Sequence, residues 1–98
     1  MYTIIFKTAA EEDLNGIFNW YEEHRKGLGY EFLISLDECI TIIQSNPSFA
    51  FNVTDNVRRA TLSRFPYAVY YTMESETVYV HVIMHQFRDP EEWQKRIK

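Results

Sequence analysis

Two amphipathic segments joined by a glycine-containing break constrain the fold of this chain more than any other feature. The first carries apolar residues at the i, i+3, i+4 and i+7 spacing of one helix face: Leu14, Ile17, Phe18 and Tyr21. The second, from about Tyr30, carries its own stripe: Phe32, Leu33, Leu36, Ile40 and Ile43. The break is at residues 27–29, and Pro47 ends the second helix because it forces the preceding residue out of helical backbone space. The two helices are therefore expected to form an antiparallel hairpin whose apolar face covers something flat.

A sheet is the expected partner of this hairpin, because the remaining segments alternate apolar and polar residues. The predicted strands are residues 2–7, 58–62, 67–73 and 77–85. A turn at residues 74–76 makes the last two strands a β-hairpin, and residues 49–57 are predicted to be a loop. On the last strand, one set is expected to face the core: Val78, Val80, Val82 and Met84. The alternate set would face solvent or a partner: Tyr79, His81, Ile83 and His85.

Capping patterns mark the starts of two helices. Thr8 and Glu11 are predicted to form a capping box at the first helix. Asp89 as N-cap, with Pro90 at the first helical position and Glu92 at the third, is predicted to form a second capping box at a short last helix, which Trp93 and Ile97 would seat on the sheet. The order of elements predicts one α+β domain over residues 1–98. We expect a small, mostly antiparallel sheet of about four strands, with the helical hairpin on one face and the short helix at the C-terminus.

Composition restricts the class of protein. No run approaches the roughly 20 apolar residues of a membrane span, and the N-terminus lacks the pattern of a signal peptide. The single Cys39 cannot form an internal disulfide and excludes a metal cluster built on cysteines. We therefore expect a cytoplasmic protein that needs no metal and no other cofactor. Seven Tyr and two Trp are more than a core of this size needs, so some of these rings are expected on a contact surface.

Charge is distributed unevenly along the chain. The net charge of −4 argues against a protein that coats nucleic acid by charge alone. Residues 1–49 hold eight acidic and three basic side chains, whereas residues 50–98 hold six acidic and seven basic ones. Five of those seven are arginines, which suit bidentate contact with phosphates or carboxylates. The second half is therefore the expected place for an anionic partner.

The last third of the chain gathers these arginines beside aromatic rings in two motifs. Residues 62–67 read LSRFPY, and residues 85–93 read HQFRDPEEW. With the helical hairpin, its proline stop and residues 57–59 (VRR), they resemble the RelE/ParE superfamily of toxins. These are the toxic halves of bacterial type II toxin–antitoxin pairs. The resemblance spans essentially the whole chain and is sharpest from Val57 onward. The two motifs most resemble those of the ParE-like, plasmid-stabilisation branch.

The resemblance implies a compact toxin that a cognate antitoxin wraps and neutralises, as a toxin–antitoxin hetero-oligomer. It also implies one of two activities. ParE-like members trap DNA gyrase on cleaved DNA and are not enzymes in their own right, whereas RelE-like members cut messenger RNA in the ribosomal A site. A member that has lost toxicity and persists as a binding module is a third reading.

An mRNA interferase needs a base for the 2′-hydroxyl, cations for the phosphorane and an acid for the leaving oxygen. The resemblance assigns these catalytic roles to Arg64, His85 and Arg88. Trp93 falls where RelE has a C-terminal tyrosine, and an indole cannot transfer a proton. The set is therefore incomplete, unless a tyrosine of residues 67–71 substitutes. This shortfall favours the ParE-like reading.

Structural roles compete with each of these assignments. His85 could bond Asp89 or a backbone group, Arg88 could pair with Glu91 or Glu92 one helical turn on, and Trp93 could be a packing anchor. Antitoxin binding depends less on this choice. The residues expected to contact a protein partner are Arg58, Arg59, Tyr67, Tyr70, Tyr71, Tyr79, His81 and Trp93.

Overall fold

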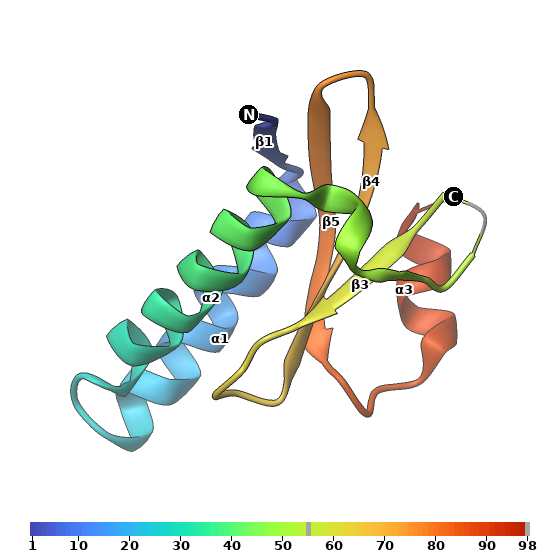
Figure 1. Cartoon of the computed structure of the whole chain (residues 1–98). Coiled ribbons are helices and arrows are strands. Elements are labelled where there is room, and N and C mark those ends of the chain that lie inside the picture. The colour runs from blue at the N-terminus through green and yellow to red at the C-terminus, as the bar shows by residue number, and fades with distance from the viewer. Residues whose placement is uncertain (55, 98) are drawn as a thin grey trace.

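The chain folds into a five-stranded sheet with helices on both of its faces (Figure 1). The computed structural model describes residues 1–54 and 56–97. Its elements are β1 (Thr3–Phe6), α1 (Thr8–His24), α2 (Leu28–Ser45), a 3-10 turn η1 (Pro47–Phe49), β2 (Phe51–Asn52), β3 (Arg58–Thr61), β4 (Tyr67–Glu74), β5 (Thr77–His85) and α3 (Pro90–Ile97). No helix in this described part of the chain is long and apolar enough to cross a membrane.

The strands lie in the order β1-β5-β4-β3-β2. Only β1 and β5 run parallel, and the other neighbours are antiparallel. The predicted α+β class and mostly antiparallel sheet are confirmed, with one strand beyond the expected four or so. That strand is β2, where Phe51 pairs with Arg59 in a segment predicted to be a loop. Two edge residues gain their strand conformation from β3, so their local sequence carries little strand signal.

The predicted helical hairpin covers one face of the sheet. Gly27 has a φ of 91°, a left-handed conformation that reverses the chain between α1 and α2. Gly29 lets the helices approach, because a Cβ there would lie 2.8 Å from the Phe18 carbonyl oxygen. The core beneath includes Phe32, Leu36 and Ile43 from α2 and the sheet residues Val69, Tyr71, Val78, Val80 and Ile83.

The opposite face of the sheet carries a smaller cluster under α3, including Tyr70, Val82, Met84 and Trp93. The prediction that Val78, Val80, Val82 and Met84 share one face is therefore wrong. The cause is a β-bulge: Tyr70 pairs with Val82 and Tyr71 with Val80, which leaves His81 as the extra residue of β5. One inserted residue exchanges the two faces for the rest of the strand, so Ile83 returns to the main core.

The two capping predictions had different outcomes. α1 begins directly at Thr8 with Lys7 as the N-cap, and no side chain of the described residues caps it, so the predicted Thr8–Glu11 box is wrong. Asp89 does cap α3, since its Oδ1 accepts from the Glu91 amide at 3.0 Å. The Glu92 side chain, expected to complete that second box, instead bonds Arg88. Trp93 is buried on the sheet as predicted.

Candidate functional site

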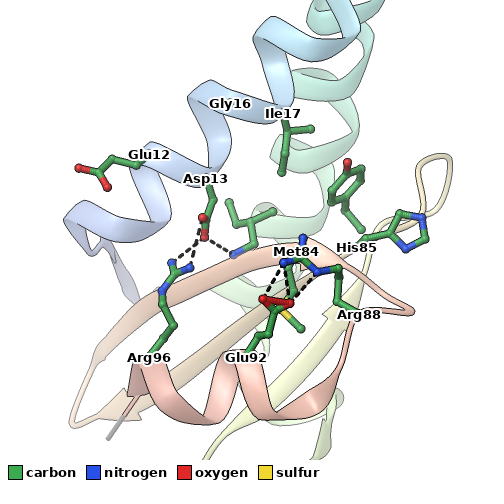
Figure 2. Close-up of a pocket in the computed structure, with 11 residues that line it drawn as sticks. Glu12, Asp13, Gly16, Ile17, Met84, His85, Arg88, Glu92 and Arg96 are labelled. Carbon is green, nitrogen blue, oxygen red and sulfur yellow. Dashed lines mark hydrogen bonds and ion pairs between the residues drawn. The ribbon is translucent and has the colours of Figure 1, made fainter.

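The first candidate site is a groove of about 350 Å³ between α1, α3 and the end of β5, called here the edge groove (Figure 2). β1 pairs with β5 only as far as Val80, so beyond it α1 and α3 flank this edge of the sheet. The groove is lined by Glu12, Asp13, Gly16, Ile17, Tyr67, Ile83, Met84, His85, Arg88, Glu92 and Arg96. It therefore brings together Tyr67, His85 and Arg88 from the sequence predictions.

Both arginines of the edge groove are neutralised by carboxylates of the chain itself (Figure 2). Arg88 makes a bidentate pair with Glu92, with both bonds at 2.6 Å. These hydrogen bonds lower the pKa of Glu92 and raise that of Arg88. Arg96 donates to Asp13 at 2.7 and 3.3 Å, and Asp13 also accepts from the Ile83 amide at 3.0 Å. Of the roles considered for Arg88, the structure shows the ion pair with Glu92, one helical turn further on.

His85 makes a backbone contact that restrains its ring. Its Nδ1 lies 3.2 Å from the Phe87 amide, which donates to it. Its ring meets that of Tyr67 edge-on, with centroids 5.5 Å apart. Burial raises the pKa of the Tyr67 phenol, opposed in part by the charge of Arg88, so the phenol is protonated at neutral pH. The histidine thus makes the backbone contact that was considered above as its structural role.

Arg64 is held away from this groove. It forms an ion pair with Glu31 of α2 at 3.2 Å, and Glu31 also pairs with Arg25 at 3.3 Å. Arg64 is not among the residues that line the edge groove. Of the three predicted catalytic residues, only His85 and Arg88 share one site.

A second groove, of about 390 Å³, lies between α3 and the β2–β3 end of the sheet and is called here the α3 groove. It is lined by Phe51, Asn52, Val53, Arg59, Tyr70, Gln86, Arg88, Pro90, Trp93 and Gln94, and none of these is acidic. Arg59 donates to the Tyr70 hydroxyl at 3.1 Å and to the Gln86 carbonyl at 3.2 Å. Its guanidinium thus lies across one wall of the groove.

Several residues of the α3 groove were missed by sequence reasoning. Phe51 is 65 % exposed at the groove's rim, and the amides of Gln86 and Gln94 also line it. The high aromatic content of the sequence was the only signal that a ring such as Phe51 lies on a contact surface. Nothing in the local sequence marks the two glutamines as groove residues. The predicted contact residues Tyr70 and Trp93 form the floor, with their rings stacked 5.2 Å apart and each no more than 5 % exposed.

Three of the predicted partner-binding residues make contacts within the fold. Tyr71 is fully buried and its hydroxyl donates to the Pro47 carbonyl at 2.5 Å, so its expected place on a contact surface is wrong. Burial raises its pKa to about 12. Arg58 donates to the Ser48 and Ala50 carbonyls and fixes the η1 segment. Trp93 is the packing anchor weighed above.

Tyr79 and His81 lie on the α3 face, near the N-terminal end of α1. The ammonium of Lys7 lies 5.2 Å from the centre of the Tyr79 ring. The His81 Nε2 and the Thr72 hydroxyl are 2.8 Å apart. Burial, and after it the charge of Lys7, lowers the pKa of His81. Both side chains stay partly exposed, as predicted.

Comparison with known proteins supports the architecture. No protein-family model matches the sequence, and neither does any curated protein. A solved structure described as the chromosomal ParDE TA system from P. aeruginosa superimposes with a TM-score of 0.75 at 18 % identity, over 87 % of this chain and 96 % of that one. The chain has the RelE/ParE toxin fold. The isolated E. coli RelE toxin also matches, with a TM-score of 0.67 at 16 % identity over 100 % of both chains. The resemblance read from the motifs is confirmed as a fold, slightly nearer to the ParDE structure.

Proposed function

We propose that this protein is the toxin of a type II toxin–antitoxin pair and that it acts as a ParE-like inhibitor of DNA gyrase. The RelE/ParE fold supports the general function. The observation that carries gyrase inhibition is that each predicted cleavage residue is engaged within the fold, with Arg64 outside the groove that His85 and Arg88 share. Arg64 is paired with Glu31 and Arg88 is paired with Glu92. His85 accepts a hydrogen bond from the backbone amide of Phe87.

Cleavage of RNA through its own 2′-hydroxyl needs cations free to bind the phosphorane as charge develops. The Glu92 carboxylate, held bidentately by Arg88, competes with the phosphorane for the guanidinium. An inhibitor that works by binding has no such need, because a paired surface arginine can still contact a partner. This arrangement of paired arginines therefore fits a non-enzymatic toxin better than a ribonuclease.

The α3 groove is the proposed seat of an antitoxin segment. Its wall carries the Arg59 guanidinium, the exposed ring of Phe51 borders it, and its described lining holds no carboxylate. An acidic segment with apolar anchors complements such a surface. We place the protein in the cytoplasm with its target and expect it to rest there as a hetero-oligomer with the antitoxin.

Expression in bacteria tests this proposal. Inducing the chain alone should arrest growth with filamentation and a DNA-damage response. Co-expression with the cognate antitoxin, expected in a small gene directly upstream or downstream, should relieve the arrest. Normal growth at high expression of folded protein would contradict every toxin reading and leave a binding module. Arg59→Glu is expected to weaken antitoxin binding, whereas Lys26→Glu, at the exposed far end of the helical hairpin, is the matched control.

RelE-like cleavage of ribosome-bound messenger is the second candidate. It is favoured by the edge groove, where Tyr67, His85 and Arg88 line one site as a general acid or base would require. This candidate predicts arrest of translation with messenger cut at codon boundaries. His85→Ala and Arg88→Ala should then abolish cleavage while antitoxin binding persists. Cleavage that survives both substitutions would remove these residues from the mechanism.

A further inference from the structure

A hollow of about 300 Å³ lies between the start of α1, the middle of β5 and the end of α3, beside the edge groove, with which it shares only Arg96 among the described lining residues. Its lining residues are Lys7, Ala9, His81, Arg96 and Ile97. Three of these five are basic, they come from three separate parts of the chain, and no described lining residue is acidic. Basic side chains repel one another, so their convergence on one hollow requires a compensating interaction.

Arg96 is compensated from outside the hollow. Its guanidinium pairs with Asp13 and also donates to the His81 carbonyl at 3.2 Å, as Figure 2 shows for the Asp13 contact. Asp13 is in turn occupied by Arg96 and by the Ile83 amide. Lys7 differs, because it makes no ion pair with the residues that the structure describes. Its positive charge therefore acts on the hollow and on His81.

The β-bulge explains how His81 reaches this position. As the extra residue of β5, it has no register partner on β4. Bulges re-aim single side chains and are frequent beside functional sites. One ring nitrogen, Nε2, is engaged with Thr72, and Nδ1 makes no hydrogen bond within residues 1–54 and 56–97. The bulge thus delivers a titratable ring with one nitrogen available to a ligand.

We infer that this hollow binds a phosphate group, held by Lys7 and by protonated His81, with Arg96 as a further donor. Charge-assisted hydrogen bonds from ammonium, imidazolium and guanidinium groups are the usual ligands of such an oxyanion. The volume exceeds the needs of a bare ion, so the group can belong to free phosphate or to a nucleotide. This site does not depend on toxin activity.

The charges around His81 fix the expected pH dependence. Lys7 opposes its protonation from the start of α1, the Asp13–Arg96 pair is internally balanced, and Thr72 on β4 is uncharged. Without a bound anion, burial and the charge of Lys7 hold the pKa of His81 below its usual value. A bound anion favours the imidazolium and raises that pKa, so affinity increases as the pH falls through it.

The test is an NMR titration of the full chain with sulfate, which stays a dianion throughout, at constant ionic strength kept with chloride. We expect saturable shifts confined to residues 7–9, His81 and Arg96, tighter binding at about pH 5.5 than at about pH 7.5, and a raised His81 pKa. Shifts spread over all exposed basic residues, or no shift in the hollow, would overturn the site.

Variants separate the site from general charge. Lys7→Met should weaken sulfate binding about tenfold, since it removes one of few charge-assisted contacts. Lys7→Arg should retain binding, and His81→Gln should abolish its pH dependence. Lys26→Met removes the same charge from the far end of the helical hairpin and should leave binding unchanged. An equal loss in Lys26→Met would overturn the site.

Two further probes identify the source of the phosphate. Inorganic phosphate that binds as tightly as a 5′-mononucleotide would support a free-phosphate site. A nucleotide that binds at least about tenfold tighter would support a nucleic-acid ligand. Failure of both to displace sulfate would overturn the inference.

Discussion

The two faces of the sheet differ in what holds their helices in place. The hairpin face buries a continuous apolar core under two long helices, built around Phe32 and Tyr71. The α3 face buries a small cluster under a helix of eight residues, which charged contacts also tie to the rest of the chain. Apolar burial is non-directional and readable from periodicity, whereas ion pairs depend on which elements meet. The difference predicts two levels of stability in one domain.

The largest expected effect lies on the hairpin face. Phe32→Ala removes a fully buried ring and should lower the free energy of unfolding by about 4 kcal/mol. Ile34→Ala, on the exposed side of the same helix, should change it by no more than about 0.5 kcal/mol. Urea denaturation followed by circular dichroism measures both. Similar losses in the two variants would refute a core centred beneath the hairpin.

Gly29→Ala tests the close approach of α1 and α2. The added methyl group would meet backbone and side-chain atoms of Phe18 and Glu22 at 2.8 Å, so we expect a loss of about 3 kcal/mol. Gly16→Ala is the matched control, because nothing lies within 4 Å of its Cβ position. Alanine there should stabilise α1 by about 1 kcal/mol. Thermal denaturation of both variants measures the two changes in stability. A Gly29→Ala variant as stable as the parent chain would show that the helices have room to separate.

Trp93→Ala tests the independence of the α3 face. Its loss should destabilise the chain by about 2 kcal/mol, less than Phe32→Ala, because α3 can undock while the sheet stays folded. Hydrogen exchange should accelerate in residues 90–97 and stay slow in β4 and β5. Uniform acceleration throughout the sheet would mean that both faces unfold as one unit.

The smallest effects concern the ion pairs. Asp13→Ala leaves the Ile83 amide without its acceptor and should cost about 1.5 kcal/mol. A double-mutant cycle with Arg96→Ala should show coupling between the two side chains. Glu92→Gln breaks an exposed pair within one helical turn and should leave stability almost unchanged. A larger effect of Glu92→Gln than of Asp13→Ala would reverse this ranking.

Sequence reasoning succeeded where a repeating pattern carries the information. The helical stripes placed α1 and α2, and Asp89 with Pro90 marked the start of α3. It failed at the bulge, because one extra residue at His81 is invisible to an alternation count and exchanges the faces of Val82 and Ile83. It also failed to find the partners of the arginines. Asp13 and Arg96 are 83 positions apart, and only the assembled sheet brings them together.

The candidate site shows the same division. The motifs marked His85 and Arg88 correctly as neighbours in one groove, since a strand end and the following turn keep them close. Arg64 was assigned to the same site by resemblance alone. Glu31, on a helix distant in sequence, holds it elsewhere.

The central claim is that this toxin fold acts by binding gyrase rather than by cutting RNA. The most direct measurement is a DNA-cleavage assay with purified gyrase and increasing amounts of the chain. We predict that cleaved gyrase–DNA complexes accumulate in proportion to the added protein and that purified antitoxin prevents this. Unchanged gyrase activity, together with cleavage of ribosome-bound messenger by the same preparation, would contradict the claim.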